Sequence, residues 1–194
     1  MELSPSLYSW LVRPKWLSDM LIKDILMDRF DFYQKNVLDF GCGVGSYCSF
    51  FSPEYYIGVD CNHKRTYYAS RKHAKYSFRV LSGYKLPVQQ NSMDYILIIS
   101  VLHHISQNDL AGYLNEFRRV LKPNGRILIF EPCFFSNSQF SNIFMKLIDR
   151  GKHIRYESNY LELFSSYNYK TEVHDRCSQL FFYTKLLFSA FPNK

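Results

Sequence analysis

Three glycines at alternate positions, Gly41, Gly43 and Gly45, are the clearest sign of a binding site in this sequence. They directly follow residues 36–40, a short apolar run that is typical of a buried strand. Glycine can adopt positive φ in such a turn, and its missing Cβ lets a bulky ligand approach the main chain. The next apolar run ends in Asp60, whose carboxylate can accept hydrogen bonds from both hydroxyls of a ribose. The pattern predicts a nucleoside site.

Alternating strand and helix patterns surround this turn and predict an α/β fold. Apolar runs predict strands at residues 36–40, 55–60, 76–81, 94–101 and 126–131. Helical patterns fall within residues 5–30, 63–73, 106–121, 140–149 and 158–166. Two further strands are expected near residues 168–175 and 179–188, as an antiparallel pair. Because the connections between the first five strands are short, we expect right-handed βαβ crossovers and a mostly parallel sheet.

Composition narrows the class of protein further. With 194 residues, 47% of them hydrophobic and 18% aromatic, the chain can bury the core of one globular domain. The five cysteines are scattered and form no CxxC pair, which disfavours a disulfide framework or a zinc cluster and fits a reducing cytoplasm. No secretory leader is expected, since the first residues lack a basic stretch followed by an apolar one.

A net charge of +7 leaves open a polyanion-binding surface. The basic residues occur in separated pairs such as Lys64-Arg65 and Arg118-Arg119, so solvated helix faces are the favoured interpretation. The longest strongly apolar run, around residues 95–102, is too short to span a bilayer. Contact with a membrane surface remains open.

The spacing of the glycine loop distinguishes two classes of cofactor. The loop reads GxGxG, with Asp39 two residues before the first glycine, whereas a dinucleotide fingerprint reads GxGxxG. Leu86-Pro87, the sequence Val101-Leu-His-His-Ile105 and the sequence Phe117-Arg-Arg-Val-Leu-Lys-Pro-Asn-Gly125 follow in order. With these segments, residues 36–131 resemble the class I S-adenosylmethionine-dependent methyltransferases, in particular the branch that acts on small molecules.

The resemblance implies S-adenosylmethionine as cofactor and S-adenosylhomocysteine as product. The Gly41–Gly45 loop would lie under the methionine moiety, Asp39 would hold the ammonium group and Asp60 would bind the ribose. The alternatives are a turn-stabilising role for Asp39 and a helix N-cap for Asp60. Further cofactor contacts are expected from Cys61, Ser82, Gly83, Tyr84 and Ser100.

One departure from the family concerns adenine. The family often has an acid shortly before Leu-Pro that accepts a hydrogen bond from the adenine amino group. Here residues 81–85 read Leu-Ser-Gly-Tyr-Lys and contain no carboxylate. Ser82, backbone groups at Gly83 and Tyr84, or stacking on Tyr84 would have to replace it.

Candidate catalytic residues follow the fourth and fifth predicted strands. His103 and His104 come after the fourth strand and Glu131 ends the fifth, where open α/β sheets bind ligands. In similar small-molecule methyltransferases a histidine at this turn, helped by an acid, acts as general base. The sequence does not rank the two histidines, and packing beneath the loop is the alternative for either. Glu131 could equally form a rigid strand exit, and no metal site is expected.

The acceptor side is expected beyond Glu131. Residues 149–155 are unusually polar, and Arg150 and Arg155 could grip a phosphate or carboxylate, with Tyr8 as an apolar contact. The alternative is a solvated surface loop. We therefore expect one domain over residues 1–194, divided into an N-terminal helical cap (1–35), a cofactor-binding core (36–131) and acceptor-side helices with terminal strands (132–194). Its fold class is a Rossmann-like three-layer α/β sandwich around a mostly parallel seven-stranded sheet with an antiparallel C-terminal strand.

The sequence thus predicts a methyltransferase that acts on an O or N atom of a small molecule, with sugars and lipid-linked compounds as candidate acceptors. Two alternatives stay open: an RNA-modifying methyltransferase, favoured by the charge, and a non-catalytic regulatory protein that binds S-adenosylmethionine. Nucleic acid is the less favoured partner, because no RNA-binding module accompanies the domain. The sequence leaves the oligomeric state open.

Overall fold

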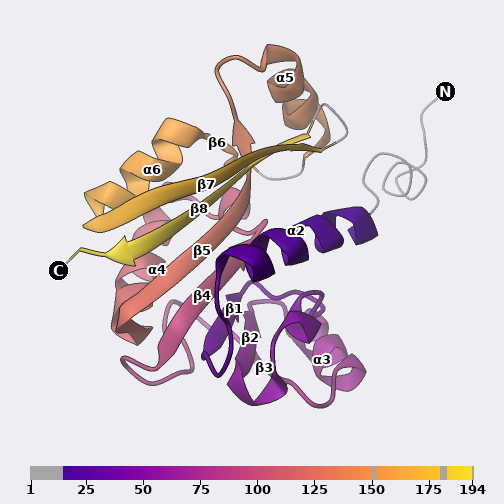
Figure 1. Cartoon of the computed structure of the whole chain (residues 1–194), viewed down its shortest axis with the longest axis vertical. Coiled ribbons are helices and arrows are strands. Elements are labelled where there is room, and N and C mark those ends of the chain that lie inside the picture. Colours follow the sequence, from indigo (N-terminus) through magenta and orange to yellow (C-terminus); the bar gives the residue numbers. More distant parts are fainter. Residues whose placement is uncertain (1–14, 150–151, 180–182, 194) are drawn as a thin grey trace.

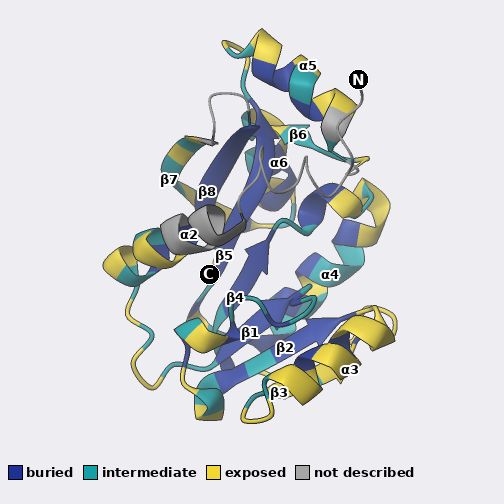
Figure 2. Cartoon of the chain, turned by 90° about the vertical axis from the view of Figure 1, so that its right-hand side faces the viewer, coloured by how far each residue is buried: buried dark blue, intermediate teal, exposed yellow. Residues whose placement is uncertain are grey.

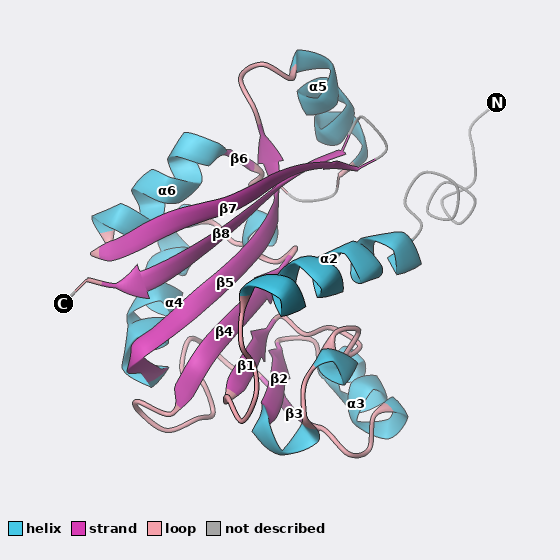
Figure 3. Cartoon of the chain, viewed as in Figure 1, coloured by secondary structure: helices cyan, strands magenta, loops and turns pink. Residues whose placement is uncertain are grey.

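The central sheet of the protein lies between two layers of helices (Figure 1). The structure is a computed structural model that describes residues 15–149, 152–179 and 183–193. Two of the predicted acceptor-side residues, Tyr8 and Arg150, lie outside the described residues. The three-layer architecture is the one that the sequence predicts (Figure 3).

Seven strands run through the sheet in the order β3-β2-β1-β4-β5-β8-β7, and a short eighth strand, β6, pairs with the end of β5. Strands β1 to β5 are parallel, while β8 is antiparallel to both of its neighbours. This confirms the predicted Rossmann-like class. The strands are β1 (Val37–Phe40), β2 (Tyr56–Asp60), β3 (Ser77–Val80), β4 (Met93–Ile99), β5 (Leu121–Phe134), β6 (Arg155–Tyr156), β7 (Tyr169–Gln179) and β8 (Tyr183–Pro192).

Helices cover both faces of the sheet (Figure 2). In the described part of the chain they are α2 (Lys15–Arg29), α3 (His63–Lys72), α4 (Gln107–Val120), α5 (Gln139–Ile148) and α6 (Glu157–Ser166). Three short 3-10 turns complete the elements, namely η1 (Cys48–Phe50), η2 (Pro53–Tyr55) and η3 (Leu102–His104). The predicted cap of α4 is present, because the Ser106 hydroxyl accepts a hydrogen bond from the Asp109 backbone at 3.2 Å.

The apolar run in β4 serves both helical layers at once. Ile96 and Ile98 join the core cluster under α4 and α6, while Leu97 and Ile99 join the cluster under α2. Because side chains alternate across a strand, a central strand must be apolar at every position. That alternation explains the uninterrupted run of aliphatic residues in the sequence.

Strand β5 is longer than the sequence predicts. The Lys122–Gly125 segment interrupts the apolar pattern, so we expected the strand to begin at Arg126, yet β5 extends from Leu121 to Phe134. The strand begins earlier because Leu121 pairs with Met93 of β4, and the register of the two strands shifts between Met93 and Tyr95. In the described part of the chain, no helix is both apolar enough and long enough to cross a membrane.

The core supports a direct test of packing. Phe188 of β8 is fully buried and its ring lies 5.4 Å from that of Phe164 in a T-shaped contact. Phe188→Ala should lower the free energy of unfolding by about 3–5 kcal/mol, because α6 cannot close the cavity that forms. Tyr67→Ala, at a position that is 68% exposed, is the matched control and should have little effect. Urea unfolding followed by circular dichroism measures both, and equal losses would contradict the packing described.

Candidate functional site

A cavity of about 400 Å³ lies at the carboxyl ends of β1, β2 and β4. The strand order reverses between β1 and β4, and open α/β sheets bind ligands at such a switch point. Five residues that the sequence predicted line this cavity: Gly41, Asp60, Cys61, Ser100 and His104. Six further lining residues were not singled out by the sequence analysis: Phe40, Arg65, Leu81, Val101, Ile105 and Tyr113.

The three glycines of the loop differ in what surrounds them. All have positive φ, between 55° and 77°, which side chains rarely tolerate. A Cβ on Gly41 would collide with Val101, and one on Gly45 would collide with Phe78. A Cβ on Gly43 would meet no protein atom within 4 Å. Gly41 and Gly45 therefore permit close packing, whereas Gly43 leaves open space beside the main chain.

Asp60 holds this loop from the end of β2. One of its carboxylate oxygens accepts a hydrogen bond from the Gly43 backbone at 2.9 Å, and the other accepts one from the Asn62 backbone at 2.8 Å. The N-cap of α3 is the Asn62 side chain, which accepts from Lys64 and Arg65. Asp60 thus fixes the glycine loop and lines the cavity. It is not the N-cap of α3, the alternative role considered from the sequence, because Asn62 is that cap.

Asp39 lies beneath the loop, only 2% exposed, with its carboxyl 2.6 Å from the Tyr56 hydroxyl that donates to it. Burial raises the pKa of Asp39 from 3.8 to about 7, and the hydrogen bond from Tyr56 opposes this rise only in part. The predicted contact with an ammonium group stays a prediction, because Asp39 is not among the residues that line the cavity.

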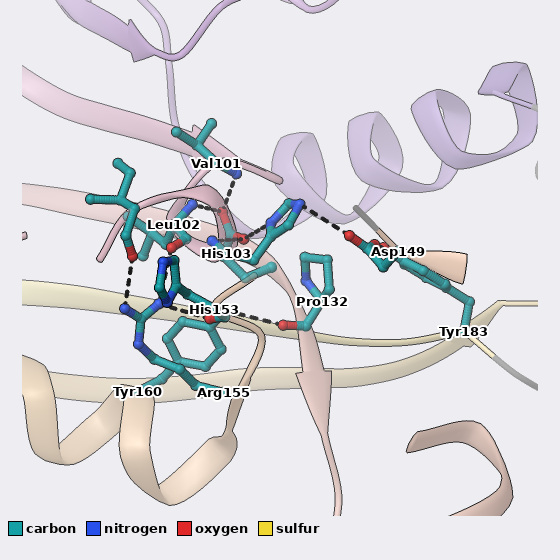
Figure 4. A network of polar contacts seen from close by, with 11 residues as sticks. Val101, Leu102, His103, Pro132, Asp149, His153, Arg155, Tyr160 and Tyr183 are labelled. Atoms are coloured by element: carbon teal, nitrogen blue, oxygen red, sulfur yellow. Dashed lines mark hydrogen bonds and ion pairs between the residues drawn. The ribbon is translucent and has the colours of Figure 1, made fainter. Parts of the chain in front are cut away.

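Glu131 at the end of β5 fixes the turn that follows β4. Its buried carboxylate accepts hydrogen bonds from the backbone of Val101 at 2.5 Å and Leu102 at 2.9 Å, and more weakly from that of His103. The same carboxylate lies 2.7 Å from Nδ1 of the His103 ring (Figure 4). A buried carboxylate without such donors would be very unfavourable, so Glu131 and the turn stabilise each other.

The two adjacent histidines face different environments. His103 is buried, with Nδ1 at Glu131 and Nε2 3.7 Å from the Asp149 carboxylate, which in turn contacts the Tyr183 hydroxyl (Figure 4). His104 is exposed at the wall of the cavity. Burial lowers the pKa of His104, and the neighbouring His103 lowers it further. The geometry therefore separates two residues that the sequence could not rank.

Arg155 makes contacts other than those that the sequence predicted. Its guanidinium donates to the backbone carbonyls of Leu102, His153 and Ile105 at 2.9–3.0 Å and lies over the Tyr160 ring (Figure 4). These contacts tie the segment after α5 to the turn after β4. In the structure Arg155 therefore joins two backbone segments through hydrogen bonds. Its contact with a substrate anion stays a prediction.

The segment expected to recognise adenine lies beside the cavity. Tyr84 donates its hydroxyl to Asp109, and its ring meets Tyr113 edge-on at a centroid distance of 5.0 Å. Neither Tyr84 nor Ser82 and Gly83 line the cavity, whereas Tyr113 does. Tyr113 was missed because it reads as one more apolar residue on α4 in the sequence.

Arg65 is the cation in the cavity wall. It lies in the first turn of α3, five residues after Asp60. In the sequence it reads as part of a solvated basic helix face. Among the described residues, no group of three or more His, Cys, Asp or Glu side chains could hold a metal ion.

Comparisons with known proteins match the part of the chain that forms this cavity. A family model described as a methyltransferase domain matches residues 38–129, from β1 into β5. Norajmaline N-methyltransferase of Rauvolfia serpentina is 29% identical over 106 residues, covering 49% of this chain and 35% of the relative. An uncharacterised protein of Methanocaldococcus jannaschii is 33% identical over 93 residues, covering 48% of this chain and 39% of the relative. The chain therefore covers less than two fifths of the length of either relative.

Solved structures share the whole fold. The YcgJ protein of Bacillus subtilis has a TM-score of 0.71 at 18% identity, covering 92% of this chain and 99% of that one. Magnesium protoporphyrin IX methyltransferase of Synechocystis, solved with bound S-adenosylhomocysteine, has a TM-score of 0.67 at 14% identity, covering 90% of this chain and 82% of that one. At these identities the likeness shows the fold.

Asp39 gives a test that depends on pH. Because its pKa is raised to about 7 in the folded chain, ionisation favours the unfolded chain, and the free energy of unfolding should fall as pH rises from about 4 to 7. Asp39→Asn retains an acceptor for Tyr56 but cannot ionise. We expect it to match the wild type at pH 4 and to be more stable at pH 8 by about 1 kcal/mol or more, roughly 2–4 °C in Tm. Thermal melts at both pH values measure this, and an equal effect at both would contradict the burial described.

Proposed function

We propose that this chain is a class I S-adenosylmethionine-dependent methyltransferase and that it transfers a methyl group from S-adenosylmethionine to an O or N atom of a small molecule. The observation that carries the proposal is the cavity at the switch point. Its wall brings together the glycine loop, the carboxylate of Asp60 and the imidazole of His104. We retain residues 36–131 as the cofactor-binding core and residues 132–194 as the acceptor side.

The cavity suits a nucleoside donor in its chemistry. Asp60 offers carboxylate oxygens to ribose hydroxyls, and Gly41 is the glycine of the loop that lines the cavity. Gly43 is not among the lining residues, but the open space beside it is where we place the methionine moiety. We assign adenine to the part of the wall formed by Leu81 and Tyr113, both apolar. Arg65 in the same wall can donate to the acceptor nitrogens of the base, which would replace recognition by the missing acid.

Asp39 supports the donor site from below. A positively charged ammonium group near this buried carboxyl would favour its ionised form and lower its pKa. Donor binding would then be linked to release of a proton from Asp39 at neutral pH. This role is consistent with a carboxyl whose pKa is raised by burial.

We assign the general base to His104, and a positioning role to His103 and Glu131. When bound, S-adenosylmethionine would supply a methyl carbon activated by its sulfonium, and the acceptor's O or N atom would bond to that carbon as the carbon–sulfur bond breaks and sulfur keeps the electron pair. His104 takes the proton from the acceptor, and its lowered pKa keeps the imidazole neutral near pH 7.

The acceptor class is a finer part of the proposal. The wall combines apolar side chains with charged and polar groups, among them Asp60, Arg65 and His104, which fits a small organic molecule, with sugars and lipid-linked compounds as the candidate classes. A non-catalytic donor-binding protein is the second candidate, favoured by the missing adenine acid. Formation of S-adenosylhomocysteine in the presence of pooled phenols, sugars and amines separates the two, since only an enzyme produces it.

Gly43 tests the donor site. Gly43→Ala places a methyl group in the open space beside the loop, so it should weaken S-adenosylmethionine binding at least tenfold, because that space is where the methionine moiety is proposed to lie. Titration calorimetry with S-adenosylmethionine measures the affinity. Asn91→Ala, at a loop position with nearly the same positive φ, controls for backbone strain and should bind the donor normally. Unchanged affinity in Gly43→Ala would mean that the donor lies elsewhere.

The histidines test the assignment of the base. His104→Ala should lower kcat by roughly 10²–10⁴-fold with little change in donor affinity, because it removes a proton acceptor whose ring contacts the His103 ring at a centroid distance of 4.0 Å but anchors no backbone. In the wild type, kcat should fall as the pH drops through a midpoint below 6.5, since the pKa of His104 is lowered. Steady-state rates across pH, with the acceptor found from the pool, measure both.

His103→Ala serves as the contrasting variant. It should chiefly reduce stability, because it leaves the buried carboxylates of Glu131 and Asp149 without the ring between them. If His103→Ala lost turnover at full stability while His104→Ala kept it, the assignment would be reversed.

A further inference from the structure

The outer face of α5 presents an apolar stripe to solvent. Phe140 is 84% exposed, Ile143 is 58% exposed and Leu147 is 80% exposed. These positions, separated by three and four residues, lie along one side of the helix. Figure 2 shows α5 projecting beyond the carboxyl end of the sheet, with exposed positions on its outer side. Large apolar side chains gathered on one exposed helix face mark an interaction surface.

The inner face of the helix is firmly attached, so the stripe has a fixed direction. Met145 is buried between Phe134 of β5 and Tyr183 of β8. The Asn142 side chain donates to the Phe135 carbonyl at 2.8 Å and accepts from the Phe135 backbone at 3.2 Å. The outward side chains therefore cannot turn inward without breaking these contacts.

Positive charge borders the stripe. Lys146 and Lys152 are both exposed. The acid in this stretch, Asp149, directs its carboxylate inward to Tyr183 and His103. An apolar stripe flanked by cations is the pattern of a helix that lies in the surface of an anionic bilayer.

Two other occupants fit these charges less well. A second copy of the chain, docked through the same stripe about a twofold axis, would bring like charges together. Residues 1–14 contain one acid and one basic residue, Glu2 and Arg13, so they offer no excess negative charge to Lys146 and Lys152. Anionic lipid matches both the apolar stripe and its cationic border.

From these observations we propose that α5 docks the protein on an anionic lipid surface, with Phe140, Ile143 and Leu147 inserted among the lipids. The residue that follows the helix, Asp149, contacts His103, the neighbour of His104 in the cavity wall. Docking would therefore bring the acceptor side of the cavity close to the lipid. This interaction goes beyond methyl transfer and does not depend on it.

Vesicle sedimentation tests the proposal with the full chain. Wild-type protein should sediment with vesicles of phosphatidylcholine and phosphatidylglycerol, and less with phosphatidylcholine alone or at high salt. The triple variant Phe140→Ser, Ile143→Ser, Leu147→Ser should partition at least roughly tenfold more weakly, because it removes the inserted apolar surface. Tyr33→Ser with Tyr67→Ser, at exposed aromatic positions elsewhere, is the matched control and should bind as the wild type does.

A second variant tests the charges separately. Lys146→Gln with Lys152→Gln should weaken partitioning onto phosphatidylglycerol vesicles roughly fivefold for each cation, and leave any binding to phosphatidylcholine unchanged. Failure of the wild type to bind, or binding by the triple variant equal to that of the wild type, would overturn the proposal. So would sedimentation velocity showing a dimer that the triple variant disperses. Calorimetry with S-adenosylmethionine on the same variants separates this outcome from failure of the proposed function, since donor affinity should not change.

Discussion

The contact between the Glu131 carboxylate and the turn after β4 organises the whole site. A parallel sheet leaves the backbone N–H groups of such a turn without partners in the ladder, and a buried acid at the end of the next strand satisfies three of them. The turn in turn supplies the hydrogen bonds that make a buried carboxylate tolerable. Three residues of this segment thereby take fixed places in the cavity wall. Ser100 has a positive φ of 55°, Val101 caps the 3-10 turn, and His104 is the last residue of that turn.

The same turn links the two halves of the chain. Arg155 donates to the carbonyls of Leu102 and Ile105, and the His153 backbone donates to the His103 carbonyl at 2.9 Å. Residues 153–155 are thus held to the turn after β4 by hydrogen bonds to its main-chain carbonyls. The two histidines lie in different environments because consecutive side chains of the short 3-10 turn point in different directions. One ring is buried between carboxylates, and the other reaches the cavity.

The glycine loop illustrates how three similar residues come to differ. Gly41 and Gly45 leave no room for a Cβ because side chains pack against them, whereas Gly43 has open space beside it and a positive φ of 55°. Below them, Asp39 and Tyr56 form a buried polar pair, and Asp60 ties the loop to the end of β2. The electrostatic character of the site therefore depends on burial as much as on the identity of its charged residues.

The sequence by itself determined the fold class, the order of strands and helices up to β5, and the place of the glycine loop after β1. These follow from local patterns: an apolar run over residues 95–99 of β4, glycines where φ is positive, and a Ser106 cap before an amphipathic helix. Tertiary structure alone decided which histidine faces the cavity, and that Arg155 contacts backbone carbonyls. It also brought Arg65 and Tyr113 into the cavity wall. Such contacts join residues far apart in the chain, and their geometry depends on how strands and helices pack, which no local spacing encodes.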